Sequence, residues 1–537
     1  MGVSAAAGAP VAVTPALSCD RFPLFYWLLT LLARATSAGK EILLAAVLGT
    51  SPWKDALVAA WTAPALVASY GNETLPALLT PAWARSASRP VRALVGSVAA
   101  AQMLLSVAAL LWPRALIALV APGLTGAAWT GAIALERWLA LNIALLGGQT
   151  MLAARWNAQR RFGWMPAGTS CAAATVLAAL ALTPGMALER RIFWIGGAIT
   201  VGNVLGLVLM LTPALRRGAR RPAAPSGAAA VTVGGGAKSH WPALGVLLGA
   251  TLVLNLVPLA ERMAASGLHP GSLAAFDYGE RLVQMAFSVT VAPFTAVSFT
   301  RLAEAAVPGR AAPPAFAAHF EAAWQGLLTL IAPAAAALAV YARLLTRCIF
   351  GWGRFGAASV ALTAPVVAIK GAGLELDAAF YFLLFAIYAP GRERSKLPIA
   401  VALAAANLPL LFWWARLWGV AGLAAAHVAG CAAALAWIGA RHRRYLPGLR
   451  CCAGIAAGVR AGGLAIAAAL GVRALLPQAA LAGGLGGAAS CGWAALALAA
   501  TALLTAAMAA LWAPELWTGV RQALAPAPGL AAAGGRP

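Results

Sequence analysis

Apolar runs of about 20 residues recur along the chain, and this feature limits the possible folds more strongly than any other. They extend from Phe22 to Trp512. A helix of that length crosses the roughly 30 Å of hydrocarbon in a bilayer. Only 10% of the residues are charged, whereas a soluble domain carries about 25%. We therefore predict an all-α polytopic membrane protein and exclude a water-soluble catalytic domain.

The apolar runs predict about fourteen transmembrane helices. Their expected ranges are 24–47, 53–70, 93–112, 133–153, 165–183, 193–213, 242–262, 274–299, 320–341, 357–388, 398–414, 418–439, 454–475 and 489–512. The segment between the sixth and seventh runs is rich in Gly, Pro, Ala and Arg and has no periodic apolar face. It therefore predicts a linker.

We expect two lobes of six helices each, followed by two further helices. The predicted ranges are 1–21 for a disordered cytoplasmic tail, 22–213 for the N-lobe, 214–240 for a cytoplasmic linker, 241–445 for the C-lobe, 446–513 for spans 13 and 14, and 514–537 for a second cytoplasmic tail. A weak repeat supports the division, since Pro166 and Pro398 both open spans after basic loops. Such repeats are typical of transporters that rock about a central site.

Basic residues are distributed unevenly between the two sides of the membrane. With the amino terminus in the cytoplasm, 23 Lys and Arg fall on the cytoplasmic side and ten on the opposite side. Positive loops stay in the cytoplasm, so we expect both termini there and an even number of spans. The net charge of +24 therefore reflects topology rather than nucleic acid binding.

The cysteines and histidines do not show the spacings of a disulfide framework, a metal site or a catalytic triad. The seven Cys lie mostly in or beside apolar runs and are interpreted as small apolar fillers. The five His are scattered, which predicts neither a metal site nor a hydrolytic triad. We expect no catalytic residue and no cofactor, and the protein is not predicted to be an enzyme.

Six basic residues remain inside the predicted spans: Arg34, Lys40, Arg137, Arg281, Lys370 and Arg460. Each costs about 2.5–3.5 kcal/mol at a helix centre that faces lipid, so they must face water, a partner or an anion. We assign Arg137 and Arg460 to local pairing or the interface. Arg34 and Lys40 point about 120° apart and can line one broad wall. A basic cavity attracts phosphate or carboxylate.

Four stretches carry a family resemblance: 33–61 (ARATSAGKEILLAAVLGTSPWKDALVAAW), 156–167 (WNAQRRFGWMPA), 274–302 (AAFDYGERLVQMAFSVTVAPFTAVSFTRL) and 388–398 (YAPGRERSKLP). In order and spacing they resemble the lipid II flippases (MurJ/MviN type) of the multidrug/oligosaccharidyl-lipid/polysaccharide exporter superfamily. The resemblance implies a V-shaped pair of lobes in the bacterial cytoplasmic membrane. It also implies outward movement of an undecaprenyl-diphosphate-linked glycan by alternating access, with membrane lipids and cell-envelope glycosyltransferases as partners.

The resemblance also assigns substrate-binding residues. The family's cavity residues fall on Arg34, Lys40 and Glu41 in span 1, on Asp55 at the start of span 2 and on Arg281 in span 8. Lys40 departs from the family's usual Arg, and Ala68-Ser69 stand where the family carries a double arginine. Two substrates therefore stay open: lipid II, and another lipid-linked oligosaccharide destined for capsule, O-antigen or exopolysaccharide.

The resemblance leaves the energy source open. Glu261 matches a carboxylate that helps to bind sodium in some relatives, and Asn407 is expected nearby. The alternative is that Glu261 pairs with Arg262 or a loop charge. Coupling to Na⁺, to H⁺ or to the membrane potential would each be compatible with the sequence.

Two other functions compete with the flippase. A cation-coupled multidrug exporter of the same superfamily usually has twelve spans and an acidic cavity. A membrane glycan polymerase or ligase would need a large outward loop that bears catalytic residues. The predicted fourteen spans, basic cavity and short outward loops favour the flippase.

Overall fold

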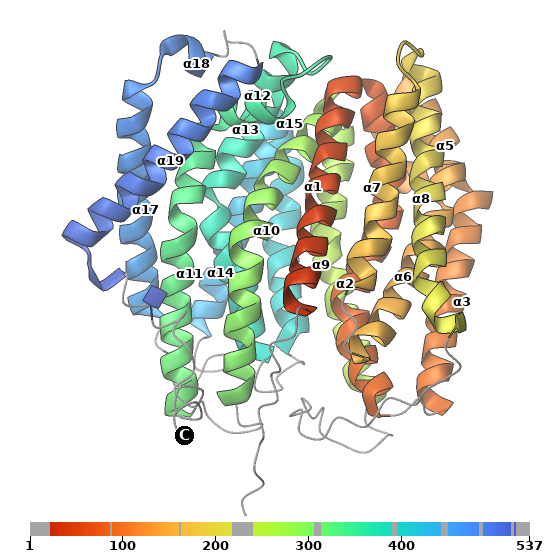
Figure 1. Ribbon diagram of the computed structural model, residues 1–537, viewed down its shortest axis with the longest axis horizontal. Helices are drawn as coiled ribbons and strands as arrows, with labels where there is room; N and C mark the ends of the chain where they lie inside the picture. Colours follow the sequence, from red (N-terminus) through yellow and green to blue (C-terminus); the bar gives the residue numbers. More distant parts are fainter. Residues whose placement is uncertain are drawn as a thin grey trace, which may run out of the picture.

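The computed structural model describes residues 22–85, 89–159, 163–216, 240–305, 313–388, 395–441, 449, 451–482, 487–516 and 520–521. Throughout these residues the regular structure is helical, without a strand (Figure 1). This confirms the predicted all-α fold. The predicted tail 1–21, most of the linker and most of the second tail lie outside the described residues.

The first eight helices gather on the right of Figure 1. They are α1 (Phe22–Leu48), α2 (Pro52–Arg85), α3 (Arg89–Leu111), α4 (Pro113–Val120), α5 (Gly126–Leu139), α6 (Leu141–Ala158), α7 (Trp164–Leu182) and α8 (Leu188–Arg216). Helix α2 packs against α5 and α6, and α7 packs against α1 and α8.

The following helices form a second group around α11. They are α9 (His240–Ser266), α10 (Ser272–Ala305), α11 (Pro314–Val340), α12 (Ala342–Phe350), α13 (Ala357–Ala372), α14 (Leu374–Tyr388) and α15 (Lys396–Ala440). Helix α9 packs along α15. On the outer side of α11 and α12 lie α17 (Cys452–Leu475), α18 (Gln478–Ala482) and α19 (Gly487–Trp512) (Figure 1).

Many of these helices are suited to cross a membrane. Within the described residues, eight are individually long and apolar enough, and three bent pairs raise the number to as many as eleven. Helix α15 is 45 residues long and breaks at Gly419, whose φ of 58° lies in the left-handed region that favours glycine. This helix therefore corresponds to two predicted spans, 398–414 and 418–439. The number fourteen stays a prediction.

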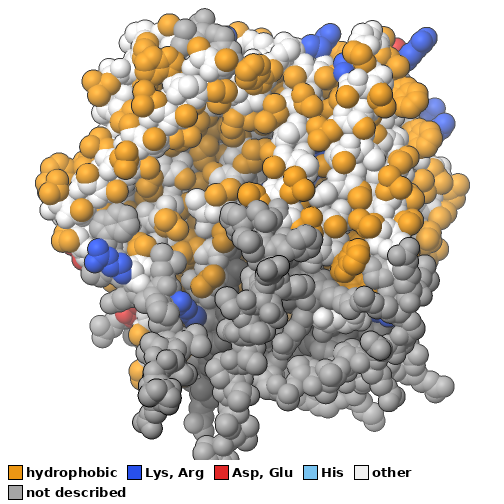
Figure 2. Space-filling model, viewed as in Figure 1, with side chains coloured by type: hydrophobic (Ala, Val, Ile, Leu, Met, Phe, Trp, Pro, Cys, Tyr) orange, Lys and Arg blue, Asp and Glu red, His pale blue; other side chains and the backbone are white. Residues whose placement is uncertain are grey.

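The outer surface fits a lipid environment. Figure 2 shows hydrophobic side chains over most of the described surface in that view. Large apolar side chains stand exposed on several helices, among them Leu104, Leu182, Val459 and Leu503. A water-soluble protein rarely leaves so much apolar surface open, whereas lipid tails cover it without cost. The chain is therefore a multi-pass membrane protein.

The two groups of helices meet at the end where α1 turns into α2. The hydrogen bonds that cross between them there include Arg354 N to Ala46 O at 2.8 Å, Gly123 N to Ser266 Oγ at 3.1 Å, and Thr50 Oγ1 with Ser359 Oγ at 2.8 Å. Gly353 has a φ of 58° and lies directly against the backbone of Ala46, where a Cβ would not fit. We call this set of contacts between the two groups of helices the seam.

Two cysteines meet where α12 packs on α19. The Sγ atoms of Cys348 and Cys491 lie 2.8 Å apart, although the residues are 143 positions apart in the chain. The interpretation of the cysteines as small apolar fillers did not predict this contact. We expect the two-electron oxidant diamide to join them in a disulfide, because the two thiols already touch. Non-reducing peptide mass spectrometry would identify the linked peptides. Cys348→Ser must remove the product, and a link from Cys491 to another cysteine would contradict the packing.

Candidate functional site

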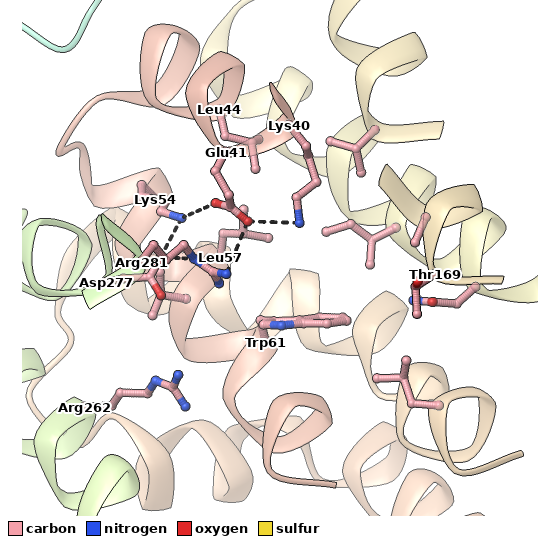
Figure 3. A pocket seen from close by; sticks show the side chains of 16 residues that line it. Lys40, Glu41, Leu44, Lys54, Leu57, Trp61, Thr169, Arg262, Asp277 and Arg281 are labelled. Carbon is pink, nitrogen blue, oxygen red and sulfur yellow. Dashed lines mark hydrogen bonds and ion pairs between the residues drawn. The ribbon is translucent and has the colours of Figure 1, made fainter. Parts of the chain in front are cut away.

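A cavity of about 180 Å³ lies between the two groups of helices, beside the seam. Figure 3 shows the side chains that line it. Four of these are basic and two are acidic: Lys40, Lys54, Arg262 and Arg281, with Glu41 and Asp277. The lining thus carries two more positive than negative charges. At about 30 Å³ for each water molecule, the cavity has room for roughly six waters or a small anionic group.

An ion-pair network joins three helices across the cavity (Figure 3). Glu41 Oε1 lies 2.9 Å from Lys40 Nζ and 3.3 Å from Arg281 Nη1. Asp277 Oδ2 lies 2.9 Å from Lys54 Nζ and 3.2 Å from Arg281 Nε. Arg281 therefore bridges an acid of α1 and an acid of its own helix.

The members of this network differ in exposure. The side chains of Glu41, Lys54 and Asp277 are only 3–6% exposed, whereas those of Lys40 and Arg281 are 23% and 34% exposed. Buried charges are costly unless they are paired. The two acids and Lys54 therefore form a paired base, while Lys40 and Arg281 present donors to whatever enters the cavity.

The start of α2 explains how Lys54 reaches this place. Pro52 begins the helix, a position for which its fixed φ is suited. Lys54 then lies in the first turn, where the helix dipole disfavours a positive charge. Asp277 compensates for this at 2.9 Å, and the ring of Tyr278 lies 4.4 Å from the ammonium. The buried ammonium of Lys54 is therefore stabilised by two residues of α10.

The sequence model of the family described as lipid II flippase MurJ matches residues 44–518. The chain belongs to this family. A curated relative, the lipid II flippase MurJ of Burkholderia cenocepacia, is 24% identical over 391 residues, which cover 70% of this chain and 73% of the relative. The family match thus includes the cavity residues Lys54, Arg262, Asp277 and Arg281, whereas Lys40 and Glu41 lie just before it.

Solved structures of relatives show the same fold. One is a lipid II flippase MurJ in an inward closed conformation, with a TM-score of 0.75, 14% identity and coverage of 92% of this chain and 100% of that chain. Another is an inward-facing multidrug resistance transporter of the MATE family, with a TM-score of 0.59, 11% identity and coverage of 78% and 97%. The MATE likeness is thus the weaker of the two.

The structure brings together three of the residues that the resemblance to the lipid II flippases assigned to the substrate. Lys40, Glu41 and Arg281 all line the cavity. Arg34 does not: its side chain is exposed on α1, about 9 Å along the helix axis from Lys40. Glu41 is buried and pairs with Lys40 and Arg281, so it positions these two cations.

Asp55 lies outside the cavity lining. Its two carboxylate oxygens accept hydrogen bonds from the backbone N–H groups of Gly271, at 2.6 Å, and Ala274, at 2.7 Å. These groups belong to the start of α10, where a carboxylate satisfies donors that have no partner within the helix. In this structure Asp55 positions the helix that carries Arg281.

Sequence reasoning missed Lys54, Asp277 and Arg262. Lys54 and Arg262 stand at span ends and were counted as charges of the opposite side, yet both line the cavity. Two features of the sequence could have indicated Lys54 and Asp277. Lys54 is a cation in the first turn of a helix, and Asp277 precedes Arg281 by four residues, which places both on one helix face.

Glu261 belongs to a second polar cluster, in the other group of helices. Its Oε1 lies 3.3 Å from Lys370 Nζ and 2.8 Å from His427 Nδ1. Its partners are thus neither Arg262 nor a loop charge. Asn407 is buried on α15 and donates to Leu403 O at 3.2 Å; within the described residues it makes no hydrogen bond with Glu261.

The remaining span charges have simpler surroundings. Arg460 forms an exposed ion pair with Glu515, with 2.5 Å between Nη1 and Oε1. Arg137 is exposed in the last turn of α5. Both positions agree with the assignment to local pairing or the interface.

A larger cavity of about 840 Å³ lies between α11, α14, α15 and α17. Apolar side chains such as Leu328, Leu383 and Val459 form most of its walls, and Glu375 is the acid among them. Such walls suit a hydrocarbon chain, because they remove apolar surface from water.

Proposed function

We propose that this protein moves an undecaprenyl-diphosphate-linked glycan from the inner to the outer leaflet of the bacterial cytoplasmic membrane. The observation that carries the proposal is the basic cavity between the two groups of helices, in a chain of the lipid II flippase family. Lys40 and Arg281 would meet the diphosphate with charge-assisted hydrogen bonds. The excess of two positive charges offsets the charge that such a group brings into a partly desolvated site.

The same observation separates this proposal from a cation-coupled drug exporter. A cationic drug would be repelled by four basic side chains, whereas a diphosphate is attracted. The apolar cavity beside α17 further supports a lipid-linked substrate, since it offers room for part of a polyprenyl tail. Lipid II is the substrate for which the relatives described above are named, and we take it as the first one to test.

Reconstitution in liposomes would test this function. Fluorescent lipid II is placed in both leaflets, and a membrane-impermeant reductant destroys the accessible fluorophores. We expect the purified protein to expose the protected fraction much faster than protein-free liposomes do. A second undecaprenyl-diphosphate glycan distinguishes the two open substrates. A rate equal to that of empty liposomes for both lipids would contradict the proposal.

We further propose that both termini lie in the cytoplasm, as the basic loops indicate. In a variant without native cysteines, we expect single cysteines at positions 190 and 347 to react with a membrane-impermeant thiol reagent in intact cells. Cysteines at 85, 217 and 443 should react only after the cells are permeabilised. The opposite pattern would invert the orientation, and the seam would then close the cytoplasmic side.

A further inference from the structure

A buried cluster of titratable side chains joins five helices of the second group. Its members are Glu261 (α9), Glu280 (α10), Lys370 (α13), Asp377 (α14), and His427 and Cys431 (α15). Lys370 Nζ lies 3.1 Å from Glu280 Oε1 in addition to its contact with Glu261. The nitrogen, oxygen and sulfur atoms of Asp377, His427 and Cys431 lie within 4.8 Å of one another. We call this group the His427 cluster.

The imidazole of His427 lies between two carboxylates. Its Nδ1 is 2.8 Å from Glu261 Oε1, and its Nε2 is 3.3 Å from Asp377 Oδ1. An ionised carboxylate only accepts hydrogen bonds, so both contacts are hydrogen bonds only when both ring nitrogens carry a proton. The geometry therefore fits the imidazolium form and distinguishes it from the neutral form.

Lys370 already supplies a cation where Glu261 could otherwise bind one. Its ammonium is 3% exposed and lies 3.3 Å from Glu261 Oε1, the same oxygen that faces His427. Its other side lies 4.6 Å from the centre of the Phe276 ring. A sodium ion at Glu261 would have to displace this ammonium, which disfavours a sodium site built on that carboxylate.

The cluster has a partly exposed side and a buried side. The side chains of His427, Asp377 and Glu280 are 20–32% exposed, whereas Glu261 and Lys370 are 1–3% exposed. Asp377, which contacts His427 Nε2, therefore offers a route for a proton between the exposed side of the cluster and the imidazole. Glu280 is also the neighbour of Arg281 on α10, so the cluster and the cavity share one rigid helix.

We propose that His427, held between Glu261 and Asp377, is the proton-binding group that couples a proton gradient to transport by this protein. The proposal rests on the proposed flippase function. With three carboxylates and Lys370, the protonated cluster carries a net charge of −1. Release of the proton from His427 to water leaves one carboxylate without its donor and lowers the net charge to −2. The contacts between α9, α14 and α15 then loosen, and α10 transmits the change to Arg281.

The test measures lipid II movement in proteoliposomes with and without an imposed pH difference. The membrane potential is clamped at zero with potassium and valinomycin, and sodium is omitted. We expect the pH difference to change the wild-type rate about fivefold or more, the lower range of known couplings between sites. For each variant, the rate with the pH difference is divided by the rate without it, and these ratios are compared. The ratio should fall to one in His427→Gln and in Asp377→Asn, two substitutions that differ in how they disturb the fold.

His269→Gln is the matched control, because His269 is exposed in the connection between α9 and α10. Its ratio should equal that of the wild type. A wild-type ratio of one, an unchanged ratio in both cluster variants, or a requirement for a sodium gradient would overturn the proton coupling. In each of these outcomes lipid II still moves. If wild-type protein moves no lipid at all, the flippase function itself fails, and the two failures are thus distinct.

Discussion

Arg281→Ala abolishes glycan export while the protein still reaches the membrane at normal abundance: this is the result we expect at the central cavity. Arg281 presents its guanidinium to the cavity with a third of its side chain exposed, and charge-assisted hydrogen bonds contribute about 1.5–3 kcal/mol each. Loss of two such bonds to a diphosphate lowers the rate by roughly two orders of magnitude or more. The measurement is the lipid-linked intermediate on the inner leaflet together with surface glycan.

Three companion substitutions sharpen this experiment. Lys40→Ala should be as severe, whereas Lys40→Arg should retain function because it keeps the charge on a forked side chain. Arg281→Lys should do worse than Lys40→Arg, since lysine cannot bridge two acceptors as a planar guanidinium does. Arg137→Ala is the control, because Arg137 is exposed at the end of α5. Full export by Arg281→Ala would show that Arg281 serves only to pair Glu41 and Asp277.

Lys54→Met should lower the stability of the protein strongly. Lys54 is 3% exposed and lies 2.9 Å from Asp277, which is also buried. Breaking a buried pair from one side leaves an uncompensated charge and costs about 3–5 kcal/mol. We expect a clear fall in the apparent unfolding temperature of the detergent-solubilised protein, measured by size-exclusion chromatography after heating.

A double variant distinguishes charge from packing. Lys54→Met combined with Asp277→Asn removes both partners, so it should regain much of the lost stability. Arg460→Met is the matched control, because it breaks an ion pair whose partners are more than half exposed and should cost less than about 1 kcal/mol. If the double variant is less stable than Lys54→Met alone, Lys54 acts through packing on Tyr278 and not through its charge.

The sequence predicted the helical fold well but not where helices bend. An apolar run indicates that a segment crosses the membrane, but it does not show a helix break when the residues at the break are also apolar. Val95–Leu111 and Pro113–Val120 meet at 98°, and the break coincides with Pro113, a signal that was present in the sequence. The break between α13 and α14 at Gly373 is milder, at 49°, and passes unnoticed inside one predicted span.

The site was predicted in part for a related reason. A charge in the middle of an apolar run demands an explanation, so Lys40 and Arg281 stood out. Charges at span ends, such as Lys54 and Arg262, fit the interface equally well, and only the mutual packing of α2, α9 and α10 decides which way they face. The two carboxylates beside His427 have no local signal either, since Glu261 and Asp377 lie on other helices.

The seam has an energetic consequence for the transport cycle. In addition to the three hydrogen bonds named for the seam, Asp55 of α2 accepts two from the start of α10 in the other group of helices. The neutral hydrogen bonds of the seam join small groups and backbone, and two ion pairs, Lys54–Asp277 and Glu41–Arg281, cross between the same groups of helices. Each of the neutral bonds exchanges with water for only about 1 kcal/mol. Opening at the seam therefore also requires these ion pairs to separate, and an anionic ligand that takes over their cations lowers the free energy of that step.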